Sequence, residues 1–177
     1  MEFRDLKSDE IDVRVAQLTK EWLTLLLYKD ARVDMNILDE TVKPENWERD
    51  HKELKGNIYC GIGIWNEEKN RYIWKWDAGK ESNQEAEKGE ASDSFKRARC
   101  KLAEFGRELY TSPMIFIPRV DEQGQVNYEI QEEKGKIKCK TKFRVEAIEI
   151  TDKVITGLAI KNNKNKRVFV WKKETKW

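Results

Sequence analysis

The amino-acid sequence predicts an α+β protein, in which a three-strand antiparallel meander packs on a long helix and a small antiparallel β extension follows. Three observations support this class: period-two alternation over 47–78, a helical pattern over 88–109, and renewed alternation after residue 136. A chain of 177 residues is long enough for one substantial core with an appended subdomain. The expected organisation is a β-β-β-α core at 1–110, a connector at 111–135 and a basic β extension at 136–177.

The N-terminal residues are expected to form short elements that lead into the meander. Ser8, followed by apolar residues at helical spacing, predicts a short capped helix. The apolar run 22–28 fits either a buried strand or a continuation of that helix, and we favour the strand. Apolar residues over 31–42 have helical spacing and stop before Pro44, so a helix is expected there.

Residues 47–78 alternate with a period of two, as strands do. The central strand has an apolar face: Ile58, Cys60, Ile62 and Ile64. Gly61 and Gly63 lie on its other face, where missing side chains allow a helix or another backbone to approach, although plain packing is the commoner use. Four aromatics of this region fit either a core or stacking on nucleic-acid bases: Trp65, Tyr72, Trp74 and Trp76.

The segment from Lys88 predicts a helix with an apolar seam beside a cationic flank. The seam recurs at steps of four and three: Ala91, Phe95, Ala98, Leu102, Phe105 and Leu109. The flank combines Lys88, Ser92, Lys96 and Arg99. This arrangement is suited to holding a polyanion, although the periodicity also fits a solvated amphipathic helix.

The charge of the chain is unevenly distributed. Residues 136–177 carry 13 Lys/Arg and 4 Asp/Glu, and the residues before them carry 22 and 29, so the two parts have net charges of +9 and −7. Cations in the first part of this region alternate with apolar residues: Lys138, Lys140, Lys142 and Arg144. Such asymmetry indicates either a nucleic-acid surface or a head-to-tail contact between subunits.

The sequence lacks the residues that several kinds of functional site require. The chain has a single histidine, His51, and three cysteines without Cys-x-x-Cys spacing, which argues against a zinc site or a disulfide framework. It has no Gly-x-x-x-x-Gly-Lys-Ser/Thr loop for a nucleoside triphosphate. Its apolar runs are too short to span a bilayer, and its first residues lack signal-peptide order. We therefore expect a cytoplasmic protein that is not an enzyme and needs no cofactor.

Seven strings of this sequence, in order and at matching spacing, resemble the Rad fifty-two single-strand annealing superfamily, and its phage Sak-type recombinase branch in particular. They are Tyr28–Val33, Asn36–Asp39, Pro44–Trp47, Gly56–Gly63, Trp74–Gly79, Glu90–Ala98 and Phe105–Tyr110. The resemblance covers roughly residues 11 to 110. It implies a β-β-β-α core, assembly into rings or open arcs, and single-stranded DNA lying in an external basic groove.

By this resemblance, the backbone of the DNA strand contacts Lys88, Ser92, Lys96 and Arg97, with Arg32 near another contact. The helical pattern places Arg97 on the face away from Lys96, so a salt bridge between subunits is the alternative role for Arg97. The family often has a further cation one turn later, where this chain has Cys100 between Arg99 and Lys101; either of these two cations is a candidate for that contact. A family glycine-rich string is also interrupted here by Glu104. Local packing is therefore expected to differ from that of the family.

The resemblance implies ATP-independent annealing of complementary single strands in phage-type homologous recombination, by a homo-oligomer. Candidate partners are a single-strand-binding protein or an exonuclease, in a bacterial host cytoplasm if the chain is phage-encoded. The 136–177 extension lies outside the shared core. It is expected either to form a second DNA surface, through its four alternating cations, or to cover a neighbouring subunit. Two alternatives remain open: a protein that protects single-stranded DNA ends without annealing them, and a structural or regulatory oligomer.

Overall fold

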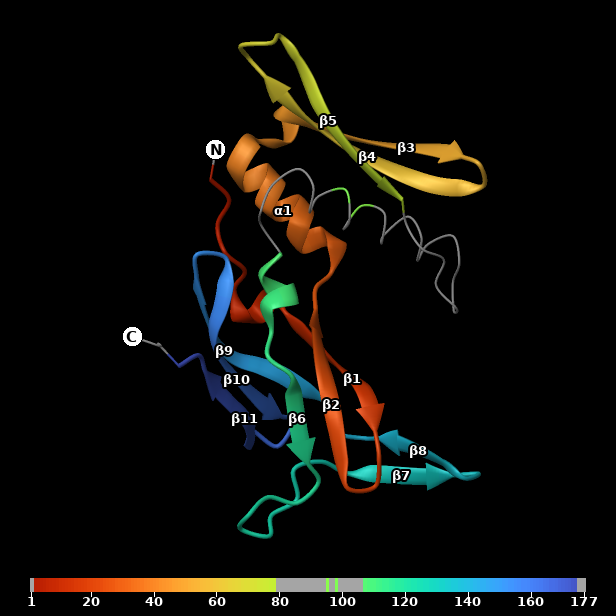
Figure 1. The fold of residues 1–177 in the computed structure, drawn as a ribbon, viewed down its shortest axis with the longest axis vertical. Helices are drawn as coiled ribbons and strands as arrows, with labels where there is room; N and C mark the ends of the chain where they lie inside the picture. The colour runs from red at the N-terminus through yellow and green to blue at the C-terminus, as the bar shows by residue number, and fades with distance from the viewer. Residues whose placement is uncertain (1, 79–94, 96–97, 99–106, 175–177) are drawn as a thin grey trace. The chain divides into compact units, whose positions relative to one another are not determined.

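The computed structural model of the chain describes residues 2–78, 95, 98 and 107–174 (Figure 1). The chain divides into two compact units, and each is discontinuous in sequence. Unit 1 comprises Met1–Asp5 and Asp30–Gly106, and unit 2 comprises Leu6–Lys29 and Arg107–Trp177.

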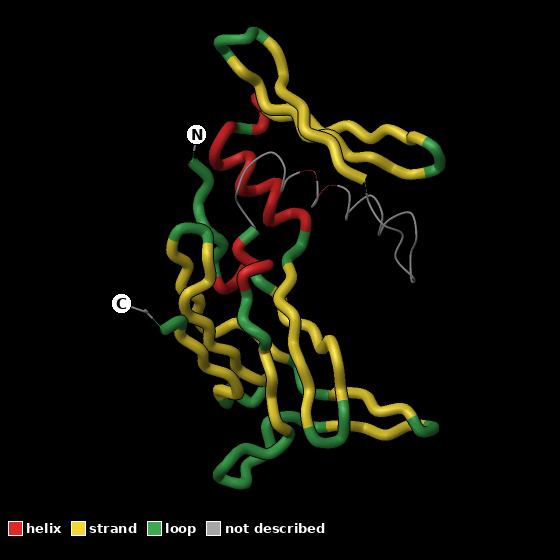
Figure 2. Tube along the Cα trace, in the orientation of Figure 1, coloured by secondary structure: helices red, strands yellow, loops and turns green. Residues whose placement is uncertain are grey.

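The predicted fold class is wrong. Strands predominate in the described part of the chain (Figure 2), which contains eleven strands and one complete α-helix, α1 (Ala31–Val42), of 12 residues. The largest sheet has six strands, and the segment 136–177 supplies three of them instead of forming a separate small extension. The cause is pairing between strands far apart in sequence, which local periodicity does not encode.

In unit 1, helix α1 has the bounds that the sequence predicts. It begins after Asp30, whose carboxylate accepts a hydrogen bond from the N–H of Arg32 at 2.8 Å and so caps the helix. It ends at Val42, the next residue Lys43 has a φ of 68°, and the turn η2 (Pro44–Asn46) follows. The cap and the proline are local signals, which is why the sequence located this helix correctly.

The predicted three-strand meander is also present in unit 1. It consists of β3 (Trp47–Leu54), β4 (Asn57–Asn66) and β5 (Arg71–Ala78), paired antiparallel in that order. The indole N–H of Trp47 donates to Asp39 of α1 at 2.7 Å, which ties the helix to the start of β3. The buried apolar side chains come from α1, β4 and the segments beside them: Phe3, Ile37, Leu38, Val42, Cys60, Ile62, Ile64, Phe95 and Ala98.

Unit 2 is built on the six-stranded sheet. Its strands are β1 (Asp12–Leu18), β2 (Trp22–Tyr28), β6 (Ile115–Pro118), β9 (Phe143–Thr151), β10 (Val154–Asn162) and β11 (Arg167–Lys172). They lie in the order β11-β10-β9-β1-β2-β6, and β1 meets β9 where Asp12 pairs with Arg144. Cα atoms of β11 and β6 approach within 8 Å, so the two edges of the sheet lie near each other.

The helix predicted from Ser8 is not formed. Residues Ser8–Glu10 make a single 3-10 turn, η1, and the chain then enters strand β1. Strand β2 has the predicted bounds. A second 3-10 turn, η3 (Glu108–Thr111), precedes β6, and a separate two-stranded hairpin is made by β7 (Ile130–Glu133) and β8 (Lys136–Cys139). Over 2–78 and 107–174, no helix is long and apolar enough to cross a membrane.

An ion-pair cluster connects three strands of unit 2. Glu146 of β9 accepts hydrogen bonds from the Arg167 guanidinium at 2.6 and 2.8 Å, and the Lys161 ammonium lies 2.6 Å from the same carboxylate. Hydrogen bonds from Arg167, which have the largest effect, and from Lys161 lower the pKa of Glu146 to about 2. The folded state favours the ionised carboxylate. The ion pairs of the cluster therefore make their full contribution to the stability of the folded protein above the unfolded-state pKa of about 4.3. That stabilisation is lost as the pH falls from there towards 2.

We predict that Glu146→Gln lowers the urea midpoint of unfolding at pH 6 and removes part of its further decrease between pH 4.5 and pH 2.5. A glutamine has no charge to lose in this range, so the acid dependence that remains comes from other groups. Glu149→Gln on the same strand is the control, because Glu149 has a single, longer ion pair with Lys172, at 3.5 Å. An acid dependence in Glu146→Gln as steep as in the unmodified protein would contradict this account.

Candidate nucleic-acid interface

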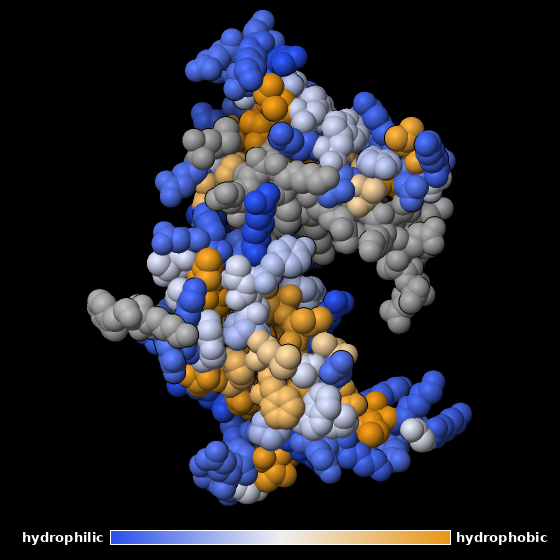
Figure 3. Space-filling view, viewed as in Figure 1, coloured by the Kyte–Doolittle hydropathy of each residue, from blue (hydrophilic) through white to orange (hydrophobic). Residues whose placement is uncertain are grey.

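Five cations of unit 2 occupy alternate positions along β8 and the start of β9. We call them the cationic stripe: Lys136, Lys138, Lys140, Lys142 and Arg144. All five side chains are exposed, whereas the residues between them are half-buried. Figure 3 shows mainly hydrophilic residues over the β7–β8 hairpin, where the stripe begins. The alternation of exposed cations and half-buried residues continues through 140–142, which lie between β8 and β9.

Backbone hydrogen bonds fix the segment that joins the two strands. The N–H of Lys140 donates to the carbonyl of Glu129 at 2.9 Å, and the carbonyl of Lys142 accepts from the N–H of Asn163 at 2.9 Å. The Thr141 hydroxyl accepts from the N–H of Glu129 at 2.8 Å. The main chain is thus held on both sides, while the lysine side chains remain in solvent.

Most of the charge of the stripe is not neutralised. Within the residues that the structure describes, no carboxylate lies within 4.0 Å of Lys136, Lys140 or Lys142. Lys138 lies 3.7 Å from Glu133, both largely exposed, which is a weak pair. Arg144 donates to the neutral amide of Asn165.

Acidic side chains near the stripe are paired with other cations. Glu129 is bound by Lys164 at 2.5 Å, and Glu132 by Lys20 at 2.9 Å. Hydrogen bonding and the charge of Lys164 lower the pKa of Glu129, so it remains ionised in this pair. The local carboxylates therefore compensate the stripe little, and the surface attracts anions.

The spacing of the stripe suits a repeating anion. Alternate residues of an extended strand lie about 6.7 Å apart, so the two cations on β8 are spaced by about that distance, and the others follow at alternate positions along the chain. Lysine and arginine bind the phosphates of nucleic acids without regard to base sequence. The geometry can therefore bind a polyanion along its length, and it has no feature that would select a base.

Of the other predicted site residues, only Arg32 lies in the part of the chain that the structure describes. Six of them lie outside the described residues: Lys88, Ser92, Lys96, Arg97, Arg99 and Lys101. Arg32 is described; its side chain is 84% exposed at the start of α1, with its guanidinium 4.0 Å from Asp30. Arg32 belongs to unit 1 and the stripe to unit 2, so they are not parts of one compact unit.

Two residues of the predicted apolar seam are described, and both are buried. Phe95 and Ala98 are helical and 1% and 0% exposed, as the seam requires at those positions. The Arg49 guanidinium of β3 lies 5.5 Å from the centre of the Phe95 ring. Leu109 instead falls in the 3-10 turn η3 of unit 2 and is half-buried.

Sequence reasoning missed Lys136 as a member of the stripe. The signal was available, because Lys136 continues the alternation of Lys138 and Lys140 by one step towards the N-terminus. Among the described residues, no group of three or more His, Cys, Asp or Glu side chains is placed to hold a metal ion. Burial raises the pKa of the Cys60 thiol to about 11, so it is a packing residue and not a nucleophile.

Comparisons with protein-family models, with curated proteins and with solved structures found no match to this chain.

Proposed function

We propose that this chain binds single-stranded DNA through its phosphates and anneals complementary strands without ATP, as a homo-oligomeric ring or arc. The observation that carries the proposal is the cationic stripe, a set of exposed and largely uncompensated cations at alternate positions of the chain. Strings of residues 11 to 110 resemble single-strand annealing proteins in order and spacing, and this resemblance is the reason for proposing annealing in particular. The segment 88–101 is proposed as the main strand contact, and the stripe as a second one.

In this mechanism the protein supplies alignment and base pairing supplies sequence recognition. Cations hold the phosphates, so the bases of a bound strand stay free to test a second strand. Because each neutralised phosphate releases counterions, affinity decreases with salt by about 0.7 log units per contact for each log unit of salt. Three contacts from Lys136, Lys140 and Lys142 would give a slope of about 2 by themselves.

The proposal is tested by measuring the anisotropy of a labelled oligo(dT) with the full chain over a series of salt concentrations. We predict tight, strongly salt-dependent binding, and a slope about 1.4 units smaller in the variant Lys96→Ala/Arg97→Ala. The control is the double variant Lys69→Ala/Lys172→Ala, at two exposed lysines outside the proposed contacts. Unchanged affinity and slope in Lys96→Ala/Arg97→Ala would remove these two residues from the site.

A structural oligomer is the second candidate, and one observation favours it. Unit 1 has 15 Lys/Arg and 19 Asp/Glu, whereas unit 2 has 20 and 14, so their net charges are −4 and +6. Opposite charges on two units of one chain suit a head-to-tail contact between copies. This candidate predicts that high salt disperses the assembly and that oligonucleotides do not bind, which the same titration measures together with size-exclusion chromatography.

A further inference from the structure

One face of the meander carries a row of aromatic side chains on β4 and β5. We call it the aromatic row: Trp65, Tyr72, Trp74 and Trp76. All four side chains are half-buried. The buried residues Cys60 and Ile62 belong to the opposite face of β4, because side chains alternate along a strand. The row therefore lies on the side of the sheet away from the core of unit 1.

Two glycines allow the indole rings to lie against the sheet. Gly61 pairs with Trp76, and Gly63 pairs with Trp74, on the neighbouring strand. A Cβ atom at Gly61 would lie 2.6 Å from the Trp76 ring, and one at Gly63 would lie 2.7 Å from the Trp74 ring. The space predicted for a helix or backbone is thus occupied by cross-strand indoles. Each indole therefore lies over the β4 backbone at one of these glycines.

Two of the four rings are nearly parallel, and the other two are tilted: Tyr72 is inclined by 52° to Trp74, and Trp65 by 72° to Tyr72. Trp74 and Trp76 have ring centres 5.5 Å apart and planes inclined by 22°, so their outer faces are nearly parallel. Tyr72 continues the row at 6.3 Å from Trp74, and Trp65 meets Tyr72 edge-to-face at 5.2 Å. A planar ring can therefore stack on one indole and remain nearly parallel to the next.

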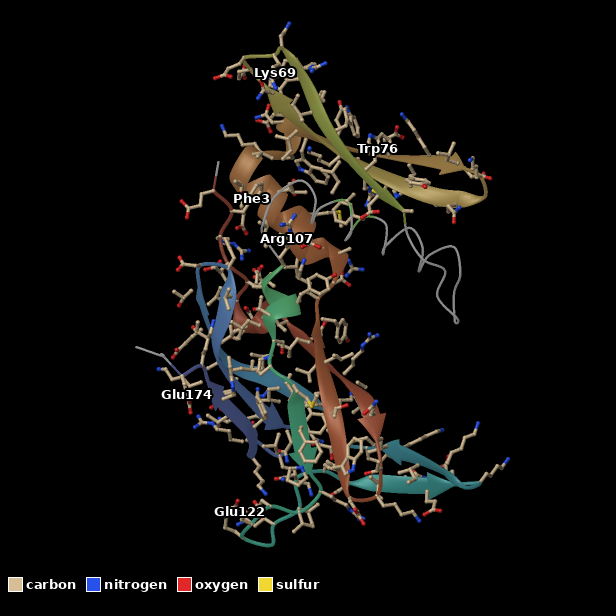
Figure 4. All side chains as sticks on the ribbon, viewed as in Figure 1. Phe3, Lys69, Trp76, Arg107, Glu122 and Glu174 are labelled. Carbon is tan, nitrogen blue, oxygen red and sulfur yellow. The ribbon has the colours of Figure 1, made fainter. Side chains whose placement is uncertain are left out.

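The charges beside the row restrict what it can bind. The Lys52 ammonium lies 4.4 Å from the centre of the ring of Trp76, which is labelled in Figure 4, and makes a cation–π contact at one end of the row. Glu48 and Asp50, opposite Gly63 and Gly61, are on the same face. With two carboxylates and one ammonium, this face is unsuited to a run of phosphates, and its binding capacity lies in the aromatic rings.

We infer that the aromatic row stacks unpaired bases of a single-stranded nucleic acid. This inference rests on the proposed function and adds a base contact to the phosphate contacts. Stacking uses the π face of a base and leaves its pairing edge free, so it is compatible with annealing. It also favours single strands over duplex, because paired bases are already stacked on each other. Every base has a π face, so little sequence preference results.

The test compares oligo(dT) with an abasic deoxyribose-phosphate oligomer of equal length and label, which has the phosphates without the bases. Titrations use the full chain, the variant Trp74→Ala, and the control Leu54→Ala, which removes an exposed apolar side chain from the same sheet. We expect the unmodified chain to prefer oligo(dT). Trp74→Ala should lose about 5- to 150-fold of that affinity, with no change in affinity for the abasic oligomer or in salt slope.

A second measurement needs no variant. Oligo(dT) should quench the tryptophan fluorescence of the unmodified chain, and the abasic oligomer at equal saturation should not. Equal binding of both probes, or equal quenching by both, would overturn the inference while leaving the proposed function intact. Dissociation of the assembly by Trp74→Ala in the absence of DNA would also overturn it, by making the row a subunit contact. Failure of the unmodified chain to bind either probe would reject the proposed function itself.

Discussion

Reversing three charges of the cationic stripe, with Lys136→Glu, Lys140→Glu and Lys142→Glu together, is expected to weaken oligo(dT) binding about 100-fold at 50 mM salt. The three lysines have no carboxylate partner among the described residues, so their charges are available to phosphates. Loss of three contacts should also reduce the salt slope by about 2. The affinity is read from anisotropy titrations at several salt concentrations.

This variant should retain its fold, because exposed lysines without partners contribute little to stability. Its circular dichroism and urea midpoint should therefore stay close to those of the unmodified chain. The control is a second triple reversal with the same change in net charge, at exposed lysines outside the stripe: Lys69, Lys172 and Lys173. Equal losses of affinity in both variants would show that binding depends on net charge alone and not on the stripe.

The largest expected effect on stability comes from Asn162, at the end of β10. Its side chain is 3% exposed and makes three hydrogen bonds. Its amide N–H donates to the carbonyl of Asn127 at 3.0 Å, and its carbonyl oxygen accepts from the N–H groups of Lys164 and Lys166, each at 3.0 Å. This single side chain therefore fixes the turn before β11 and joins it to the segment before β7.

Asn162→Ala is expected to lower the free energy of unfolding by about 3 kcal/mol, because three partly or fully buried polar groups lose their partners. Urea unfolding at pH 7 measures the change. Asn163→Ala is the control, since Asn163 is exposed in the same turn and its replacement should cost no more than about 0.5 kcal/mol. A loss below 1 kcal/mol in Asn162→Ala would mean that water replaces these hydrogen bonds.

The elements that the sequence located correctly carry local signals. Helix α1 has the cap Asp30 and the stop at Pro44. The strands β3, β4 and β5 have long alternation and turns rich in Gly, Asn and Lys. For these elements, the pattern within each segment was sufficient to specify the structure.

The elements that local sequence patterns did not predict depend on pairing with segments that are distant in the sequence. The serine at position 8 looked like a helix cap, yet Val13 and Val15 enter a strand because β2 pairs along the segment, with a bulge after Val15. Strand β6 has only four residues, and its buried Ile115 and Ile117 were hidden in an apparent connector. Joining β1 to β9 brings together residues 12 and 144, which no local pattern indicates.

Part of the candidate site was also predictable from the sequence. Alternation of apolar and basic residues indicated four of the five cations in the stripe, because strand period and exposure are linked. The sequence could not show that Glu129 and Glu132 are paired with Lys164 and Lys20, which leaves most of the charge of the stripe uncompensated. Nor could it distinguish an aromatic core from an outward row, since both give the same alternation.

The most direct test of the proposed function is the rate of duplex formation between two complementary labelled oligonucleotides, without ATP, with and without the purified chain. We predict that the protein accelerates duplex formation at low salt and that high salt abolishes the acceleration. Tight binding without acceleration would contradict annealing and favour protection of DNA ends. Absence of binding would contradict every nucleic-acid role and leave the structural oligomer.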